Sequence, residues 1–488
     1  MDRKINILFI SSEAVPYAKT GGLGDVSGAL PCYLQKSGAN VKSFIPLYGS
    51  VNKEKYQIKK LFDGSCVKMG NCEEFYSVWY TNKPSGSDFY FIEFDKYFNR
   101  PGIYNDAFSG DYTDNAYRYS FLVRAAMQAA KDMDFCPDII HVSDWQTAIA
   151  CYYVKHDNDS FFKNTKTVLT IHNIGYQGIY GADVLPYAAI SPFDFNENAF
   201  ESYGRVNLLK AGIHFADKVT TVSPTYAKEI LSAEGAGGLH KYLRERYTDL
   251  VGLLNGCDTD VWNPEKDTYI PCHYNISDYK KGKAANKKAL QQMFWLEERA
   301  DLPVFSFAAR MTKQKGVDLL IPIVEKVINT MACQMIFLGS GDDKHAEWYL
   351  GGLPARYPGR IGAFIGHSEE KVHFIEAGSD FFMMPSLYEP CGLNQMYSQI
   401  YGTLPIVRAT GGLDDTVENY NEMTGEGTGF KFWDVSSKAL YNTIGWANST
   451  YWDRKDDMDK MINRAMKRNF SWAEASENYM KMYEGMLR

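Results

Sequence analysis

A glycine-rich segment carries the first group of residues that could bind a charged ligand. Lys19-Thr20-Gly21-Gly22-Leu23-Gly24-Asp25 follows an apolar run at 5–10 and opens a pattern with helical spacing. Glycines at such a junction let the backbone approach a ligand closely, and the first N–H groups of a helix favour an anion. The Lys19 ammonium would add a positive charge. The segment predicts a phosphate site at the edge of an α/β domain, although a tight turn without a ligand explains the same glycines.

Arg310 and Lys315 form a second cationic pair, five residues apart, where another apolar run ends and a helix is expected to begin. Arginine offers a planar fork to phosphate oxygens and lysine a compact point charge. The pair therefore suits a diphosphate. Two solvated surface charges are the alternative interpretation of the residues alone.

Three polar side chains follow predicted strands directly. Asp144 and His172 come after the runs at 139–142 and 167–171, and Glu389 lies between the run at 381–384 and a helical pattern that ends near Gly402. Open parallel sheets bind ligands at the carboxyl ends of their strands. We therefore expect these side chains to face a ligand. A structural hydrogen bond is the other role open to His172, and His141 is interpreted as structural.

The elements that must position these residues alternate along the chain. Apolar, β-rich runs recur at 5–10, 41–45, 89–94, 139–142, 167–171, 219–222, 250–254, 304–308, 334–338, 362–365, 381–384 and 404–407. Helical patterns between them are typical of βαβ units and parallel sheets. A charged, lysine-rich segment at 263–300 interrupts the alternation, so a domain boundary is expected near Leu254. The Arg310 segment follows the first strand of the second half as the Lys19 segment follows that of the first.

Composition narrows the class of protein. The 488 residues, 45% of them hydrophobic, can fill more than one core, and a net charge of -7 argues against a nucleic-acid partner. No apolar run reaches the roughly 18 residues that span a bilayer. We therefore expect no membrane partner, and we expect a cytoplasmic location. Nine scattered cysteines without a C-x-x-C pair fit neither a disulfide framework nor a zinc cage.

Seven motifs stand in one order along the chain. They are Lys19-Thr-Gly-Gly-Leu-Gly-Asp25, Thr170-Ile-His-Asn-Ile-Gly-Tyr-Gln-Gly178, Val222-Ser-Pro-Thr-Tyr226, Asn255-Gly256, Arg310-Met-Thr-Lys-Gln-Lys315-Gly316, Glu389-Pro-Cys-Gly-Leu-Asn-Gln395 and Thr410-Gly-Gly-Leu-Asp-Asp-Thr-Val417. In this set the chain resembles the bacterial glycogen synthase and plant starch synthase family, retaining enzymes of glycosyltransferase family 5. The resemblance extends from residue 5 to about residue 485.

The resemblance implies a GT-B fold, in which two Rossmann-like domains face each other across a deep cleft. It implies an acceptor-side domain at 1–254, a donor-side domain at 255–470, and a helix at 471–488 that crosses back to the first domain. The activity implied is transfer of glucose from a nucleotide-glucose to the non-reducing end of an α-1,4-glucan such as glycogen, starch or a maltooligosaccharide. No cofactor and no metal are implied. ADP-glucose is the donor expected, and the oligomeric state stays undetermined.

Site residues can be carried over from the family motifs. The resemblance implies that Glu389 favours the oxocarbenium-like sugar, that Arg310 and Lys315 clamp the diphosphate, and that His172 and Asp144 bind sugar hydroxyls. The expected donor-binding residues are Lys19, Gly22, Asp25, Asn255, Gly339, His367, Cys391, Gly392 and Leu393. Two positions depart from related patterns. Tyr397 stands where many GT-B enzymes have a second Glu, and Ser143 where some bacterial members have a His.

Other interpretations are weighed against this one. Asp258 and Asp260 have the D-x-D spacing of metal-dependent glycosyltransferases, but they follow a turn and are interpreted as a structural loop. A nicotinamide dehydrogenase would need an acidic residue about 20 positions beyond the glycines, and 41–46 has none. UDP-glucose as the donor, and a catalytically idle glucan-binding relative, remain as alternatives.

Overall fold

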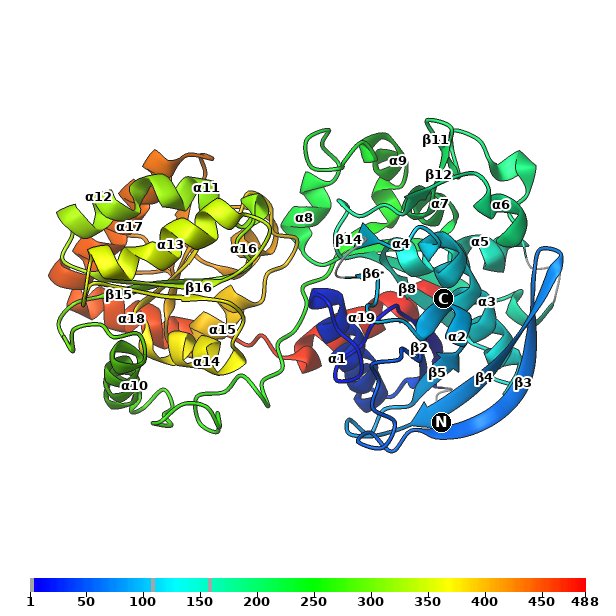
Figure 1. Ribbon diagram of the computed structural model, residues 1–488, viewed down its shortest axis with the longest axis horizontal. Coiled ribbons are helices and arrows are strands. Elements are labelled where there is room, and N and C mark those ends of the chain that lie inside the picture. Colours follow the sequence, from blue (N-terminus) through cyan, green and yellow to red (C-terminus); the bar gives the residue numbers. More distant parts are fainter. Residues whose placement is uncertain (1–3, 107–109, 157–159) are drawn as a thin grey trace. The chain divides into compact units, whose positions relative to one another are not determined.

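The computed structural model describes residues 4–106, 110–156 and 160–488, and the chain forms two compact units. The first unit holds the chain up to Gly256 together with Trp472–Arg488, and the second is Cys257–Ser471 (Figure 1). The sequence placed the boundaries after Leu254 and Phe470. Gly256 stays in the first unit because it packs on the returning chain: a Cβ there would lie 2.5 Å from the Cα of Trp472.

The first unit is built on a nine-stranded sheet in the order β14-β13-β9-β8-β1-β2-β5-β4-β3. Its strands are β1 Asn6–Ile10, β2 Asn40–Pro46, β3 Lys59–Met69, β4 Cys72–Thr81, β5 Phe89–Glu93, β8 Ile139–Ser143, β9 Lys166–Ile171, β13 Lys218–Thr221 and β14 Leu250–Gly252. All seven strands predicted for this half are present and joined in parallel. The β3–β4 hairpin, which was not predicted, pairs antiparallel with itself and with β5.

Helices cover this sheet, and short elements fill the connections. The helices are α1 Gly22–Lys36, α2 Asp95–Phe98, α3 Asn115–Asp132, α4 Asp144–Thr147, α5 Ile149–His156, α6 Val184–Tyr187, α7 Leu208–Phe215, α8 Pro224–Glu229, α9 His240–Glu245 and α19 Trp472–Leu487. The short strands are β6 Asn105–Asp106, β7 Gly110–Asp111, β10 Ile179–Tyr180, β11 Glu201–Ser202 and β12 Arg205–Asn207. The helix predicted to follow the Lys19 segment is α1, and it continues through Pro31.

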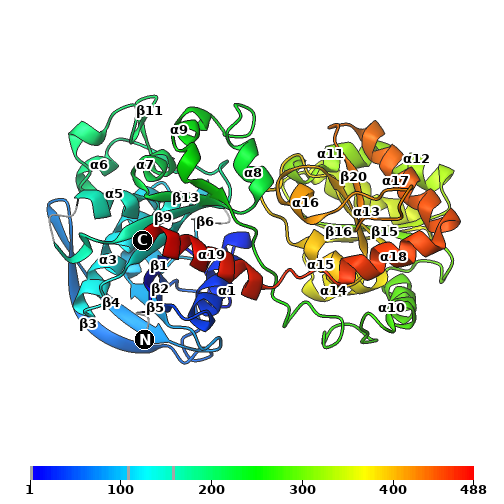
Figure 2. The same ribbon diagram turned by 180° about the vertical axis from the view of Figure 1, so that it is seen from behind.

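Figure 2 shows α19 lying beside α1, although the two helices come from opposite ends of the chain. Val26 and Leu30 of α1 share a buried apolar cluster with Tyr479 and Tyr483 of α19 and with β1. The expected return of the last helix to the N-terminal half is thus a packed contact within the first unit. Burial of these side chains removes a large apolar area from water.

The second unit is built on a six-stranded parallel sheet in the order β17-β16-β15-β18-β19-β20. Its strands are β15 Val304–Ala308, β16 Gln334–Gly339, β17 Ile361–Ile365, β18 Phe381–Met384, β19 Leu404–Arg408 and β20 Phe430–Phe432. The helices are α10 Tyr279–Met293, α11 Val317–Leu320, α12 Val324–Thr330, α13 Lys344–Arg356, α14 Glu369–Gly378, α15 Asn394–Ile400, α16 Gly411–Thr416, α17 Ser437–Asp453 and α18 Lys455–Met466. Five of the strands were predicted, and β20 was not.

Strand order reverses once in each sheet, and the reversal decides where a ligand can lie. In the first unit β1 lies between β2 and β8, and in the second β15 lies between β16 and β18. The loops after the two strands at such a point lead to opposite faces and leave a crevice at the carboxyl edge. The Lys19 segment and Asp144 follow β1 and β8, while Lys315 and Glu389 follow β15 and β18.

Throughout the described ranges, no helix combines the length and the apolar character needed to cross a membrane.

Candidate active site

In the second unit, Lys315 and Glu389 meet at the point where the strand order reverses. The Lys315 Nζ lies 2.6 Å from Glu389 Oε2, and the two side chains are only 19% and 8% exposed. Ser386 Oγ donates to the same oxygen at 3.0 Å. Because a buried ion pair is weakly screened, the pair fixes both side chains. The two residues were predicted to serve different parts of a ligand, and in this structure they bind each other.

The loop that carries Glu389 is held from two sides through its backbone. Arg408, at the end of β19, donates from Nε to the Ser386 carbonyl at 2.8 Å and from Nη2 to the Leu387 carbonyl. Gly412 N donates to the Glu389 carbonyl at 3.1 Å. A Cβ on Gly411 would come within 2.1 Å of that carbonyl, and Gly411 has φ +44°. The motif that begins at Thr410 therefore positions the Glu389 loop.

The segment after β15 presents Arg310 to solvent and turns back at Lys315. Arg310 is exposed and makes no ion pair with any described residue, so its guanidinium is available to a ligand. Thr312 Oγ1 is buried nearby in the chain without a hydrogen-bond partner in the described structure. Gly316, with φ +76°, closes the turn, and a Cβ there would lie 2.0 Å from the Pro385 carbonyl. The glycine thus lets this turn pack on the segment that leads to Glu389.

The ends of β16 and β17 lie beside this segment. Gly339 has φ +154°, and a Cβ on it would lie 1.9 Å from the Ala309 carbonyl, so only glycine fits. Gly366 N donates to the Gly339 carbonyl at 3.0 Å, which places exposed His367 one residue beyond. These strand ends form a backbone ledge at the same carboxyl edge, next to Arg310.

Cys391, Gly392 and Leu393 form the turn that leads into α15. Gly392 has φ +73°, and the side chain of Gln395 donates from Nε2 to the carbonyls of Cys391 and Gly392 at 3.0 and 3.1 Å. The sequence predicted a helix that begins close to Glu389. The structure begins α15 at Asn394 instead, because these hydrogen bonds and the left-handed glycine hold the turn out of the helix.

In the first unit, Asp144 and His172 come together at the ends of β8 and β9. Asp144 Oδ1 accepts from the His172 N–H at 2.7 Å and from the Asn173 N–H at 3.3 Å. Asp144 has φ +52°, an uncommon value for an aspartate, and burial raises the pKa of its carboxyl to about 7. Burial lowers the pKa of His172 to about 3, so the ring is neutral. Within the described structure His172 Nε2 is buried and unpartnered, which leaves it available to a ligand hydroxyl.

Two contacts between motifs that lie far apart in the sequence hold the segments next to Asp144 and His172. Tyr226 OH accepts from Ile174 N at 3.1 Å, and Gly178, with φ +65°, lets the backbone rest on the ring of Trp145. His141 is fully buried between Tyr483 OH and Thr170 Oγ1, each 2.6 Å from a ring nitrogen. His141 therefore has the structural surroundings that the sequence interpretation gave it.

The Lys19 segment is arranged by a buried carboxylate that the sequence reasoning missed. Glu13 Oε2 accepts from the N–H groups of Thr20 and Gly21 at 2.5 and 3.2 Å, and Tyr104 OH donates to Oε1 at 2.9 Å. Burial raises the pKa of Glu13. Two N–H groups expected for an anion are therefore bound within the chain. The signal available in the sequence was the position of Glu13, an acidic residue between an apolar strand and the glycine-rich segment.

Lys19 itself lies half-exposed and pairs with Asp25, with Nζ 2.7 Å from Oδ1. A Cβ on either Gly21 or Gly22 would meet no atom within 4 Å, so the backbone borders open space there. The structure thus brings Lys19, Gly22 and Asp25 together at the start of α1.

Asn255 is buried in the first unit, and its Oδ1 has no hydrogen-bond partner in the part of the chain that the structure describes. Asp258 Oδ1 accepts from the backbone of Asp260 and Val261, while Asp260 pairs with Lys266 at 2.5 Å. These are the contacts of a structural loop. No cluster of three or more metal-ligating side chains occurs in 4–106, 110–156 or 160–488.

Comparison with known proteins gives matches over nearly the whole chain. A family model described as the starch synthase catalytic domain matches residues 6–245, and one described as glycosyl transferases group 1 matches residues 291–468. The glycogen synthase of Treponema denticola is 42% identical over 98% of both chains. Glycogen synthase 1 of Geobacter metallireducens is 42% identical over 100% of this chain and 97% of its own.

Solved structures agree with these matches. The catalytic domain of starch synthase IV from Arabidopsis thaliana, bound to ADP and acarbose, superposes with a TM-score of 0.90 at 30% identity, covering 99% of this chain and 100% of that one. Sucrose-phosphate synthase from Thermosynechococcus elongatus, at 15% identity, has a TM-score of 0.59 and shares the fold. The chain belongs to the glycogen synthase and starch synthase family and is a glucosyltransferase with the GT-B fold.

Proposed function

We propose that the chain transfers glucose from a nucleotide diphosphate glucose, with ADP-glucose preferred, to the non-reducing end of an α-1,4-glucan with retention of configuration. The ion pair between Lys315 and Glu389, with exposed Arg310 on the same segment as Lys315, is the observation that carries the proposal. It brings together the charges that cleavage of a glucose–phosphate bond requires. The preference for ADP-glucose is supported by the similar starch synthase IV structure, which has ADP bound.

The charged side chains of Lys315, Arg310 and Glu389 suit the charge changes of glucosyl transfer. Cleavage of the bond concentrates negative charge on the leaving diphosphate and positive charge on the anomeric carbon of glucose. Preorganised charges that meet these changes stabilise the transition state. We assign the diphosphate to Lys315 and Arg310 and the glucose to Glu389. Ser386, which donates to Glu389 Oε2, keeps that carboxylate in place when Lys315 turns toward phosphate.

The backbone ledge at the ends of β16 and β17 is assigned to the nucleoside. Gly339 and Gly366 bring the main chain close to the ligand without side chains, and exposed His367 can stack on a base. Cys391, Gly392 and Leu393 are assigned to the phosphates through their turn. In the first unit we assign sugar hydroxyls to Asp144 and His172 and anion binding to Lys19. Gly22, Asp25 and Asn255 are assigned to donor binding as well.

Transfer is proposed to need no divalent metal, because lysine and arginine side chains supply the positive charge that a metal would supply. Asp258 and Asp260, the metal candidates by spacing, already bind backbone N–H groups and Lys266.

A donor competition tests the proposal. Purified protein is given glycogen with radiolabelled ADP-glucose or UDP-glucose, each with and without excess chelator, and incorporation of label is measured. We expect ADP-glucose to be used faster and the chelator to have no effect. A faster reaction with UDP-glucose would overturn the donor assignment. A loss with chelator that Mg²⁺ or Mn²⁺ restores would overturn the metal assignment, and no transfer from either donor would favour an idle relative.

A further inference from the structure

The second unit has a pocket of about 270 Å³ at the edge of its sheet opposite to the candidate active site. Asp380 directly precedes β18 and Gly402 lies just before β19, so the pocket adjoins the amino ends of these strands. The Lys315–Glu389 pair lies beyond the carboxyl ends. The N-terminal halves of α10 and α18 supply most of the remaining wall. The pocket is therefore separate from the proposed donor site.

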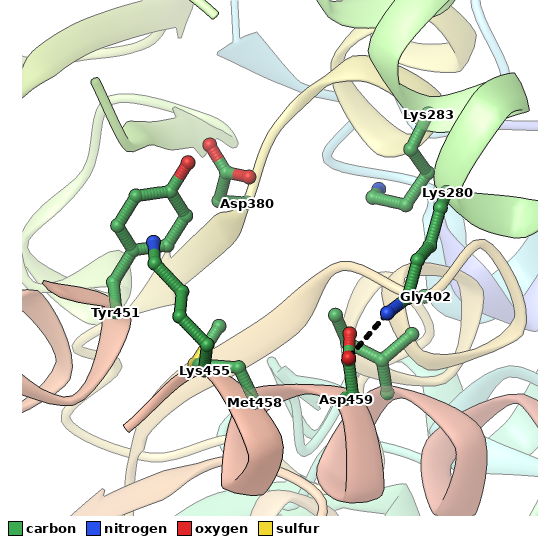
Figure 3. Close-up of a pocket in the computed structure, with 9 residues that line it drawn as sticks. Lys280, Lys283, Asp380, Gly402, Tyr451, Lys455, Met458 and Asp459 are labelled. Carbon is green, nitrogen blue, oxygen red and sulfur yellow. Dashed lines mark hydrogen bonds and ion pairs between the residues drawn. The ribbon is translucent and has the colours of Figure 1, made fainter. Parts of the chain in front are cut away.

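Four charged groups around this pocket neutralise one another in pairs. Lys280 pairs with Asp459, the contact drawn as a dashed line in Figure 3. The carboxylate of Asp459 also accepts from Tyr279 OH at 2.7 Å. Asp380 pairs with Lys287 at 2.7 Å and accepts from the Val304 N–H at 2.8 Å. Both acidic groups of the pocket are thereby occupied.

Lys283 is a cation without an anionic partner. Its Nζ donates to the carbonyls of Ala377 and Tyr401 at 3.1 and 3.3 Å and to Thr403 Oγ1 at 2.7 Å, all neutral acceptors. In Figure 3 the ammonium points into the pocket. Burial lowers the pKa of Lys283 to about 7, although Asp380 and Glu376 nearby act in the opposite direction.

Glu376 is a buried carboxyl near Lys283, and it gives the lysine little balancing negative charge. Glu376 is fully buried, and both of its oxygens are unpartnered within the described structure. Burial raises its pKa well above the ordinary value, which favours the neutral acid. An anion from outside the chain would therefore bind Lys283 by replacing one of its three neutral acceptors.

Lys455 is a second cation of this kind. Its Nζ lies 3.7 Å from the centre of the Tyr451 ring, and no carboxylate of the described residues pairs with it. Lys455 is the first residue of α18, where the helix dipole disfavours a positive charge. Two lysines that form no ion pair with a described residue thus border one pocket, and Met458 adds an apolar surface to its wall.

We propose that this pocket binds a phosphate group, carried by a small organic molecule or free, with Lys283 and Lys455 as its two cations. A phosphate monoester carries a charge of about -1.5 to -2 at neutral pH, which matches two lysines better than a single carboxylate does. The pocket lies just below the range of roughly 300–1,000 Å³ typical of ligand sites. It therefore suits a molecule of a few carbon atoms and excludes a glucan chain.

Calorimetric titration of the full chain tests the proposal with three probes: a hexose monophosphate, inorganic phosphate and the unphosphorylated hexose. We expect the first two to bind and the third not to bind. Lys455→Gln and Lys283→Gln should each weaken binding by at least about tenfold, since each removes a charged hydrogen-bond donor. Lys455 is exposed, so its variant stays informative if Lys283→Gln fails to fold.

Matched variants separate this pocket from other phosphate sites. Lys281→Gln on α10 and Lys460→Gln on α18 remove exposed lysines that do not line the pocket and should leave binding unchanged. Lys315→Ala should also leave it unchanged. Binding lost only in Lys315→Ala would place the phosphate at the donor site and overturn the proposal, as would the absence of phosphate binding or full binding in Lys455→Gln. If inorganic phosphate and the ester bind with equal affinity, the site is supported, and free phosphate is sufficient as its ligand.

Discussion

The pairing of Lys315 with Glu389 means that one ammonium serves two anions in turn. Its Nζ lies 2.6 Å from the carboxylate here, and a bound diphosphate would compete for it. The diphosphate is charged before the reaction, but bond cleavage concentrates charge on the oxygen that leaves. The contribution of Lys315 should therefore be larger in the transition state than in the ground state.

Lys315→Ala is expected to lower kcat by a larger factor than it raises the donor KM. Lys315→Arg should recover little of the lost activity, because a planar fork does not replace a compact ammonium beside Glu389. Steady-state kinetics on both variants measure this, with Lys313→Ala in the same turn as the control. A defect confined to KM would make Lys315 a docking residue.

Glu389→Gln tests the electrostatic role of the carboxylate itself. The amide keeps the shape and can still accept from Ser386, so the loop held by Arg408 and Gly412 should stay in place. Loss of one preorganised charge commonly costs about 2.7–4 kcal/mol, so turnover should fall at least ~100-fold. Turnover is measured beside a thermal melt, with exposed Glu370→Gln as the reference. Near-normal kcat in a folded variant would contradict the assignment.

Asp144 connects the site to the dependence of stability on pH. Burial raises its pKa to about 7, while an aspartate in an unfolded chain has a pKa of about 3.9. Between these values the folded state binds more protons than the unfolded state. The contribution of Asp144 to stability is therefore full below about pH 4 and falls as the pH rises toward 7.

Asp144→Asn removes this ionisation and keeps an oxygen that can accept from the His172 N–H. We expect the stability of the variant relative to the parent to rise between pH 4 and pH 7 and then to level off. Denaturant unfolding at a series of pH values measures it, with exposed Asp342→Asn as the baseline. A difference that does not vary with pH would show that Asp144 is not buried as an acid.

At the scale of elements, α16 fixes the position of Glu389 through backbone contacts. A Cβ on Gly412 would lie 2.1 Å from the Cys391 carbonyl, so an alanine must push the loop that carries Glu389 away. Overpacking of this kind costs about 1–3 kcal/mol, and a displacement of about 1 Å can cost ~100-fold in rate.

Gly412→Ala should therefore fold with modestly lower stability and lose at least about tenfold in kcat. Gly352→Ala in α13 is the matched control, because a Cβ there meets no atom within 4 Å. The control should keep its activity and gain about 0.5–1 kcal/mol of stability. Thermal melts and kinetics on the two variants decide the point. Unchanged kcat in Gly412→Ala would mean that the loop adjusts without moving Glu389.

The sequence predicted the parallel strands because strands buried on both faces read as continuous apolar runs. The hairpin of β3 and β4 was not predicted, because β3 is largely exposed and carries Lys59, Lys60 and Asp63 in place of a continuous apolar run. In the site, residues directly after strands were identifiable from their position alone. The roles of Glu13 and Arg408 were not, because each binds backbone groups at least seven residues away in the chain, and those contacts exist only after the chain folds.

At the scale of the whole molecule, the first unit is closed by the end of the chain. Trp472, Tyr479 and Tyr483 of α19 are buried, and Tyr483 OH lies 2.6 Å from His141 Nδ1. Removing these contacts would expose apolar surface on α1 and leave buried His141 with only one of its two hydrogen-bond partners. The second unit, Cys257–Ser471, has its own sheet and its own core.

A chain that ends at Ser471 is therefore expected to lose stability in the first unit alone. The truncated chain loses the burial of three aromatic side chains, worth roughly 1.5–3 kcal/mol each, which together approach the whole stability of many domains. Hydrogen exchange of the truncated and full chains should show faster exchange in β1, β8 and α1 and unchanged protection in β15 and β16. Tyr483→Phe gives the same contrast on a smaller scale, because it removes one hydroxyl and leaves the ring packed. Equal loss of protection in both units would mean that they unfold together, and that α19 stabilises the whole chain through the first unit.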